Sequence, residues 1–198
     1  MQDSFAAFVL AGGKSARMGA DKAFVEFDGR TLLARALEVT RLVTNDVQIV
    51  GDAARFAAFA PVVEDVFPGC GPLAGIHAAL RASAAELNLM LAVDMPFVSR
   101  DLLEFMIGRA RHCDALVTVP RAGRGWQPLC AVYRREFAEA AEKALREGRY
   151  KIDALFAAVT VEVIEEKELA DAGFAGGVFR NLNTREELET AAAEASPR

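Results

Sequence analysis

The chain has 198 residues, of which 53% are hydrophobic and 26% charged, and its net charge is −5. This composition is typical of a globular protein with one buried core, and it excludes a disordered chain. No basic stripe or RNA-binding signature is present, so nucleic acid is not expected as a partner. Near the N-terminus, Asp3 stands where a signal peptide needs positive charge, and the apolar run that follows is too short to span a membrane. We therefore expect a cytoplasmic protein. Its three scattered cysteines fit free thiols better than a metal site or a disulfide framework.

The predicted strands are short apolar or β-branched runs bounded by glycine, proline or acidic residues: 5–10, 47–51, 61–65, 88–94, 114–120, 129–133 and 159–164. The predicted helices have capping residues or helical spacing of apolar residues: 32–43, 52–60, 71–83, 100–111, 135–147, 151–158 and a last one from Thr184. Residues 121–128 are predicted to form a loop. Thr31 and Ser99 are predicted N-caps, and Pro72 suits the first turn of its helix.

Strands alternate with helices along most of the chain. This alternation predicts right-handed βαβ units, a mostly parallel sheet and a three-layer α/β/α fold. No repeat and no linker interrupts it, so we expect one domain over residues 1–198. In such sheets ligands bind beyond the carboxyl ends of the strands. Three predicted strands end there in reactive residues, within the sequences LAGGK, VVED and LAVD.

The stretch from Phe8 to Lys22, FVLAGGKSARMGADK, joins a buried strand to a glycine-rich loop with three cations. This pattern is typical of a polyphosphate site. It is not a P-loop, because Phe8 stands where that motif requires a glycine five positions before Gly13. It is not a dinucleotide fingerprint either, because Gly12 and Gly13 are adjacent and a lysine follows. A P-loop GTPase and an NAD enzyme are therefore disfavoured.

Chemistry suggests a role for each group. Gly12 and Gly13 let backbone amides approach phosphate oxygens, and Arg17 and Lys22 would neutralise a triphosphate. Asp94 stands at a strand end before Pro96 and suits Mg²⁺, which needs few protein carboxylates. The structural alternatives are a plain βα turn for the glycines, a solvated basic loop for the cations and a turn cap for Asp94.

Three further charged residues belong to this reasoning. Asp65 is suited to accept hydrogen bonds from guanine N1–H and the amino group, although an exposed strand-end acid is the alternative. Lys14 is as readily a surface residue as a ligand. Asp21 is expected to be structural and to orient Lys22.

The segment LAGGKSARMGADK resembles the signature L-A-G-G-x-S-x-R-M-G-x-D-K of nucleotidyltransferases in the molybdenum cofactor guanylyltransferase family. Further along, Asp65 and GPLAG (71–75) resemble that family's base-binding loop, and VDMP (93–96) its metal-binding motif. QPL (127–129) and NLNT (181–184) resemble its two later motifs. The similarity covers nearly the whole chain in order.

The resemblance implies a Rossmann-like nucleotidyltransferase fold of the glycosyltransferase-A type. It implies an enzyme that transfers GMP from GTP to the terminal phosphate of molybdopterin and releases pyrophosphate, with Mg²⁺. The implied catalytic residues are Arg17, Lys22 and Asp94, with Asp94 as the metal ligand. The implied nucleotide-binding residues are Leu10, Ala11, Gly12, Gly13, Lys22, Gly51, Asp65, Gly71, Pro72, Leu73 and Asp94. Residues 1–100 would mainly bind GTP and Mg²⁺, and residues 101–198 mainly molybdopterin.

For the pterin, we expect contacts from Gln127, Lys151, Asn181 and Asn183, with Arg124 and Trp126 nearby. Ordinary loop roles are the alternative for each, and Trp126 is as readily a partly buried anchor. His77 and His112 are expected to be structural, and the sequence offers no Ser-His-Asp or Cys-His arrangement. A phosphate monoester is already nucleophilic, so the implied reaction needs no dedicated base.

Three alternatives stay open at this point. A relative could use CTP, or could act on a sugar phosphate, although such enzymes tend to carry L-A-A-G instead of L-A-G-G. An accessory protein could bind nucleotide without turnover, although it would not need the full set of Arg17, Lys22 and Asp94. Transient contact with molybdoenzymes or their chaperones is also expected.

Overall fold

The structure, a computed structural model, describes residues 5–12, 21–123, 125–174, 177–182, 187 and 190. The predicted helix from Thr184 lies mostly outside these residues. So do five residues singled out above: Gly13, Lys14, Arg17, Arg124 and Asn183.

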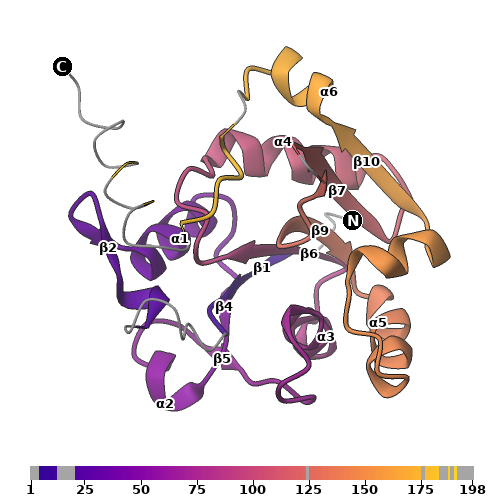
Figure 1. Cartoon of the computed structure of the whole chain (residues 1–198), viewed down its shortest axis with the longest axis horizontal. Coiled ribbons are helices and arrows are strands. Elements are labelled where there is room, and N and C mark those ends of the chain that lie inside the picture. Colours follow the sequence, from indigo (N-terminus) through magenta and orange to yellow (C-terminus); the bar gives the residue numbers. More distant parts are fainter. Residues whose placement is uncertain are drawn as a thin grey trace.

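One sheet of eight strands organises the described part of the chain (Figure 1). Its order is β10-β7-β9-β6-β1-β4-β5, and β8 pairs with β7. The strands are β1 (Phe5–Leu10), β4 (Val47–Val50), β5 (Val62–Val63), β6 (Leu87–Ala92), β7 (Val117–Ala122), β8 (Gly125–Trp126), β9 (Cys130–Arg134) and β10 (Val161–Glu165). The helices are α1 (Leu32–Arg41), α2 (Ala53–Phe56), α3 (Pro72–Ala82), α4 (Arg100–Arg111), α5 (Phe137–Arg146) and α6 (Glu166–Asp171), with 3-10 turns η1 (Lys22–Phe24) and η2 (Asp153–Ala158).

The sheet is mostly parallel, as predicted. β1 pairs in parallel with β6 and β4, so Leu10 lies opposite both Ala92 and Val50 at the carboxyl ends. Only β9 and the short β8 run antiparallel to their partners within this sheet. The reversed β9 inserts between β6 and β7, and these two strands therefore still point the same way. Six strands consequently end at one edge of the sheet.

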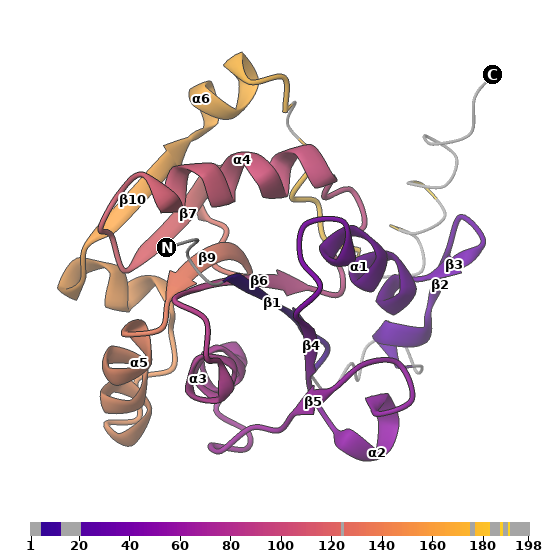
Figure 2. The ribbon, with the colours of Figure 1, turned by 180° about the vertical axis from the view of Figure 1, so that it is seen from behind.

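Helices cover both faces of this sheet, which gives the predicted three layers (Figures 1 and 2). α1 and α4 pack on one face through residues such as Leu33, Leu37 and Met106. α3 and α5 pack on the other through residues such as Ile76 and Phe137. Between them, β1 is wholly apolar and β6 is fully buried along its length, as expected for central strands of a parallel sheet covered on both sides.

The predicted helix starts are confirmed by their caps. Thr31 Oγ1 accepts a hydrogen bond from Ala34 N (3.2 Å), and Ser99 Oγ accepts one from Leu102 N (3.3 Å). Pro72 occupies the first turn of α3, where a missing N–H costs nothing. These local sequence signals therefore determine where these three helices begin.

Two local predictions were wrong, and two elements were missed. The strand expected at 61–65 is only Val62–Val63. The expected loop 121–128 contains the end of β7 and the strand β8. A hairpin of β2 (Glu26–Phe27) and β3 (Arg30–Thr31) was missed, although Asp28-Gly29 marks it, with φ of 51° and 73°. α6 was missed as well.

The described cysteines, Cys70, Cys113 and Cys130, are free thiols, and burial raises the pKa of Cys130 to about 12. Among the described residues, no helix is long and apolar enough to cross a membrane.

His77 is the main buried titratable residue of α3. Its side chain is 3% exposed and packs edge-to-face on Phe67, with ring centroids 5.3 Å apart. Its Nε2 lies 3.6 Å from Glu142 Oε2 on α5. Burial lowers the pKa of His77, and Glu142 only partly opposes this effect. The ring is therefore a neutral packing element between α3 and α5, as the sequence predicted.

This burial predicts a pH effect on stability. Because the folded pKa of His77 is lowered, the unfolded chain takes up this proton first. The free energy of unfolding should fall as the pH drops below about 6.5, the ordinary histidine pKa, until the folded pKa is reached. Urea unfolding between pH 7.5 and 5.5 should show this decrease in the wild type and in His112→Gln. The decrease should be smaller in His77→Leu, and an unchanged slope in that variant would contradict the assignment.

Candidate functional site

Four strand ends lie in a row at the carboxyl edge of the sheet. Three backbone hydrogen bonds join neighbouring ends: Val93 N to Leu10 O (3.2 Å), Ala11 N to Val50 O (3.0 Å) and Gly51 N to Val63 O (3.0 Å). The order along the edge is therefore Asp94 after β6, Gly12 after β1, Gly51 after β4 and Asp65 after β5. Gly12 and Asp94, 82 positions apart in the sequence, thus lie along the same edge of the sheet, as the strand pattern predicted.

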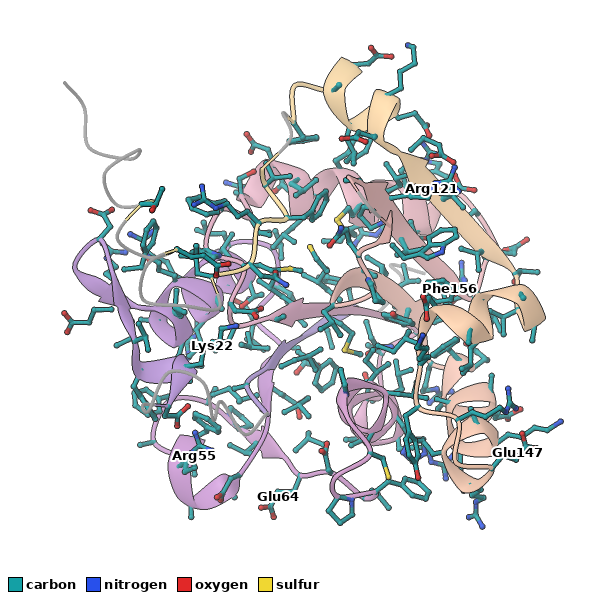
Figure 3. All side chains as sticks on the ribbon, in the orientation of Figure 1. Lys22, Arg55, Glu64, Arg121, Glu147 and Phe156 are labelled. Carbon is teal, nitrogen blue, oxygen red and sulfur yellow. The ribbon has the colours of Figure 1, made fainter. Side chains whose placement is uncertain are left out.

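Lys22 and Asp94 form an ion pair at one end of this row. The Lys22 ammonium group donates to Asp94 Oδ2, and each side chain exposes only 17% of its surface. Lys22 lies on the left of Figure 3, where β6 and β1 end. The structure therefore brings together two of the three residues predicted to be catalytic.

The turn that carries Lys22 is held by its neighbours. Asp21 caps η1 by accepting from Ala23 N (3.2 Å), and it also pairs with Arg55 of α2. The Arg55 guanidinium in turn lies 4.9 Å from the centre of the Phe56 ring. Asp21 is thus structural, as predicted. Arg55 was missed, because nothing in the sequence links it to Asp21, 34 positions away.

The backbone around Asp94 is fixed on two sides. Met95 N donates to Ala92 O (3.3 Å) and closes a turn after β6. Leu182 N donates to Asp94 O (3.0 Å), which ties the segment near residue 181 to the same turn. With Oδ2 bound to Lys22, the buried Oδ1 of Asp94 has no hydrogen-bond partner among the described residues. Such an oxygen requires a cation or a donor.

Asp65 lies at the other end of the row, beside the first turn of α3. A Cβ atom on Gly75 would stand 3.5 Å from Asp65 Oδ1 and 3.2 Å from Val50 Cγ1, so only glycine lets α3 approach this closely. Partial burial raises the pKa of Asp65. Its neighbour Glu64 has a structural task, since Glu64 Oε1 accepts from Ala53 N at the start of α2 (3.2 Å).

The loop before α3 depends on glycine. Gly69 and Gly71 have φ of 80° and 74°, a region that side chains disfavour. The structure places Pro72 at the surface and buries Leu73 completely in the core below α3. Leu10 and Ala11 are also buried, so backbone groups are what these predicted residues offer to a ligand.

The predicted pterin residues are less closely grouped. The amide of Gln127 donates to Ala122 O (3.3 Å) and Gly125 O (3.5 Å), which closes the β7–β8 hairpin. Lys151 is exposed. Asn181 lies next to the Asp94 turn through the Leu182 hydrogen bond.

Trp126 is a partly buried anchor, which was the alternative to a pterin contact. Its ring meets Phe156 edge-to-face at 5.3 Å, and Arg121 Cζ lies 5.5 Å from its centre.

A cation fits this site on chemical grounds. Mg²⁺ prefers carboxylate and carbonyl oxygens and retains several waters, so it needs only one or two protein ligands beside phosphates. Among the described residues, no group of three or more acidic, histidine or cysteine side chains is placed so that it could hold a metal ion. Asp94 Oδ1 is a buried oxygen without a donor, and it meets the requirement for a partial ligand set.

Three comparisons connect this geometry with known proteins. A family profile described as "MobA-like NTP transferase domain" matches residues 7–182. A molybdenum cofactor guanylyltransferase from Desulfosudis oleivorans is 37% identical over 96% of both chains. A probable molybdenum cofactor guanylyltransferase from Pelotomaculum thermopropionicum is 36% identical over 91% of this chain and 88% of that protein.

Solved structures agree with these sequence matches. The molybdopterin-guanine dinucleotide biosynthesis protein A of Archaeoglobus fulgidus superposes with a TM-score of 0.84, at 27% identity and over 95% of this chain and 97% of that one. A 4-diphosphocytidyl-2C-methyl-D-erythritol synthase from Anaerococcus prevotii gives a TM-score of 0.73 at 17% identity, over 97% and 96% of the two chains. The second match shows a shared fold only.

Two glycines give a matched test of the site's packing. A Cβ on Gly51 would stand 2.8 Å from the Phe56 ring, whereas a Cβ on Gly108 of α4 would meet nothing within 4 Å. Gly51→Ala should therefore lower the free energy of unfolding by about 1–3 kcal/mol. Gly108→Ala should raise it by about 0.5–1 kcal/mol, because alanine favours helix. Chemical unfolding of both variants checks this, and equal effects would contradict the packing described.

Proposed function

The chain belongs to the MobA-like NTP transferase family, and we propose that it transfers GMP from GTP to the terminal phosphate of molybdopterin. The observation that carries the proposal is the row of strand ends. It has an ammonium–carboxylate pair, Lys22 and Asp94, at one end and the Asp65 carboxylate at the other, with Gly12 and Gly51 between them. This order along the edge suits a nucleotide whose phosphates lie near Asp94 and whose base lies near Asp65.

The reaction is a displacement at phosphorus. An oxygen of the molybdopterin phosphate forms a bond to the α-phosphorus of GTP. The bond from that phosphorus to the α–β bridging oxygen breaks, and pyrophosphate leaves with the electron pair. The acceptor is an anion already, so the protein needs to position both phosphates and compensate charge.

Lys22 is the described cation best situated for this compensation. Its partly buried ammonium group would stabilise the negative charge that develops on the leaving pyrophosphate. Arg17 is proposed to assist it. A bound Mg²⁺ supplies charge neutralisation and orientation of the phosphate oxygens. Asp94 is the proposed protein ligand, because its Oδ1 is the buried oxygen that lacks a partner among the described residues.

The base is proposed to bind at Asp65. An ionised carboxylate accepts two hydrogen bonds from guanine N1–H and N2–H, an arrangement that cytosine and adenine cannot offer. The backbone from Gly71 to Leu73 would lie over the base, since Gly71 has no side chain that would block the approach. Leu10, Ala11, Gly12, Gly13, Gly51 and Pro72 complete the proposed nucleotide site.

For the acceptor, we retain Gln127, Lys151, Asn181 and Asn183 as proposed pterin contacts. Residues 1–100 would then bind mainly GTP and Mg²⁺, and residues 101–198 mainly molybdopterin, within one domain. A cytoplasmic location and transient contact with molybdoenzymes or their chaperones remain predictions from the sequence.

The nucleotide is the first property to test. Pyrophosphate release with molybdopterin and Mg²⁺ should be at least about 100-fold faster with GTP than with CTP, because a site built for hydrogen bonds rejects a base that cannot form them. In Asp65→Asn, kcat/KM for GTP should fall by about 10- to 100-fold, as expected for the loss of a charged hydrogen bond. Asp114→Ala, on an exposed loop at the amino end of β7, is the control. Equal rates with GTP and CTP would contradict the assignment of Asp65 as the residue that binds guanine.

The raised pKa of Asp65 adds a pH test to this one. A carboxylate accepts guanine's hydrogen bonds only when ionised. The kcat/KM for GTP should therefore fall as the pH drops through a pKa that lies above the usual value near 3.9. Asp65→Asn should lack this inflection, and its persistence there would assign the titration to another group.

The ion pair gives a second test of catalysis. Asp94→Ala and Lys22→Ala should each lower kcat by about 100-fold or more, because each removes charge from the reacting phosphates. Lys143→Ala, on the exposed face of α5, serves as the matched lysine control. Circular dichroism should show an intact fold in all three variants. Turnover at the wild-type rate in Asp94→Ala would discard its metal role.

A further inference from the structure

We propose that Arg55 of α2 is a positioning residue for Lys22, and that it acts through Asp21. It determines where the η1 turn holds the Lys22 ammonium group at the phosphate end of the site. This inference rests on the proposed function, in which Lys22 binds the phosphates of the nucleotide.

The two carboxylate oxygens of Asp21 have different tasks. Oδ1 accepts a hydrogen bond from Ala23 N (3.2 Å) and starts η1, whereas Oδ2 pairs with the Arg55 guanidinium. η1 has only three residues, closed by a hydrogen bond from Phe24 N to Asp21 O (3.0 Å), and a single 3-10 turn is weak on its own. The position of Lys22, the first residue of this turn, therefore depends on what holds Asp21.

α2 is a firm support for this pair, although it has only four residues. Glu64 Oε1, just after β5, accepts from Ala53 N (3.2 Å). Asp52 Oδ1, just after β4, accepts from Ala54 N (2.9 Å). Phe56, the last residue of α2, is completely buried. α2 is thereby fixed to the ends of β4 and β5, which border the proposed base site.

A second contact joins η1 to α2. The Phe24 ring stacks on the Phe56 ring, with centroids 5.8 Å apart and planes inclined by 28°. The Arg55 guanidinium lies 4.9 Å from the centre of the same Phe56 ring. Lys22 thus lies in a segment that α2 holds on both sides, and its ammonium group reaches from there to Asp94. Figure 3 shows Lys22 and Arg55 on the same side of the molecule.

The ion pair is better explained by positioning than by stability. Arg55 exposes 38% of its side chain and Asp21 exposes 26%, and ion pairs this close to solvent add little to the free energy of unfolding. Lysine, however, carries its charge on a long flexible stem, so its backbone must be fixed for the ammonium group to reach one place. A misplacement of about 1 Å in such a group costs much of its catalytic effect.

The first measurement reports the position of Lys22 without turnover. Brief acetylation with acetic anhydride, followed by mass spectrometry, gives the labelling rate of Lys22 relative to the exposed Lys143 in the same sample. In the wild type Lys22 should react slowly, because its side chain is only 17% exposed and is paired with Asp94. Arg55→Ala should raise this relative rate about threefold or more, because the released turn opens more often.

Three further variants separate the causes. Asp21→Asn keeps an oxygen for the cap of η1 and removes the charge that pairs with Arg55, so it should label like Arg55→Ala. Arg55→Lys keeps the charge and should recover part of the protection, although lysine lacks the guanidinium fork. Arg41→Ala is the matched control, since Arg41 of α1 also donates to the segment after α2, at Phe59 O (2.9 Å). It should leave the labelling rate unchanged.

The second measurement is a double-mutant cycle on pyrophosphate release with GTP and molybdopterin. Arg55→Ala should lower kcat about tenfold with little change in the KM for GTP, because Lys22 acts on charge that develops during the reaction. In the Lys22→Ala background, Arg55→Ala should lower kcat no further, since its effect passes through that one ammonium group. A purely structural role of Arg55 would lower activity in both backgrounds.

The outcomes separate this inference from the proposed function. Unchanged labelling of Lys22 in both Arg55→Ala and Asp21→Asn would overturn the inference and leave the nucleotide site standing. Additive losses of kcat in Arg55→Ala and Lys22→Ala would also overturn it, because Arg55 would then act by another route. If labelling rises but Lys22→Ala turns over at the wild-type rate, the proposed role of Lys22 in catalysis fails, whereas its positioning by Arg55 is supported.

Discussion

The ion pair between Lys22 and Asp94 joins two segments that are 72 positions apart, and the site depends on it. A carboxylate that is only 17% exposed is costly without a partner, so a cation must accompany Asp94 in every state. In this structure Lys22 is that cation. Under the proposed function, a triphosphate and a metal ion would bring opposite charges, so the metal would take the place of Lys22 at Asp94 and Lys22 would bind a phosphate. The pair would then hold both groups close to the positions in which they act.

The remaining features of the site follow from where the strands end. Parallel strands with matched register place Leu10 opposite Ala92 and Val50, so the residues that follow them emerge side by side. Close approach then requires small residues. Gly51 leaves room for the Phe56 ring, and Gly75 brings α3 against Val50 and Asp65. A larger side chain at Gly51 would push against Phe56, and one at Gly75 would move α3 away from Val50 and Asp65.

Much of this arrangement was predictable from local signals. Apolar runs identified β1, β4 and β6, caps at Thr31 and Ser99 fixed two helices, and the mostly parallel sheet put the reactive residues at one edge. The β2–β3 hairpin was also within reach, because Asp28-Gly29 is a strong turn signal. The remainder depends on contacts between distant segments. No pattern near Arg55 reveals its pairing with Asp21, and no pattern near residue 181 reveals that its neighbour binds the backbone of Asp94.

The hydrogen bond from Leu182 N to Asp94 O connects the second half of the chain with the first. The sequence suggested a nucleotide-binding first half and a pterin-binding second half. However, β9 lies between β6 and β7, and Leu129 O accepts from Ala92 N (2.7 Å) just before Asp94. Leu182 then reaches the same turn from the other side. The second half therefore supports the turn that carries Asp94 directly, so under the proposed function the acceptor would approach a phosphate site to which both halves contribute.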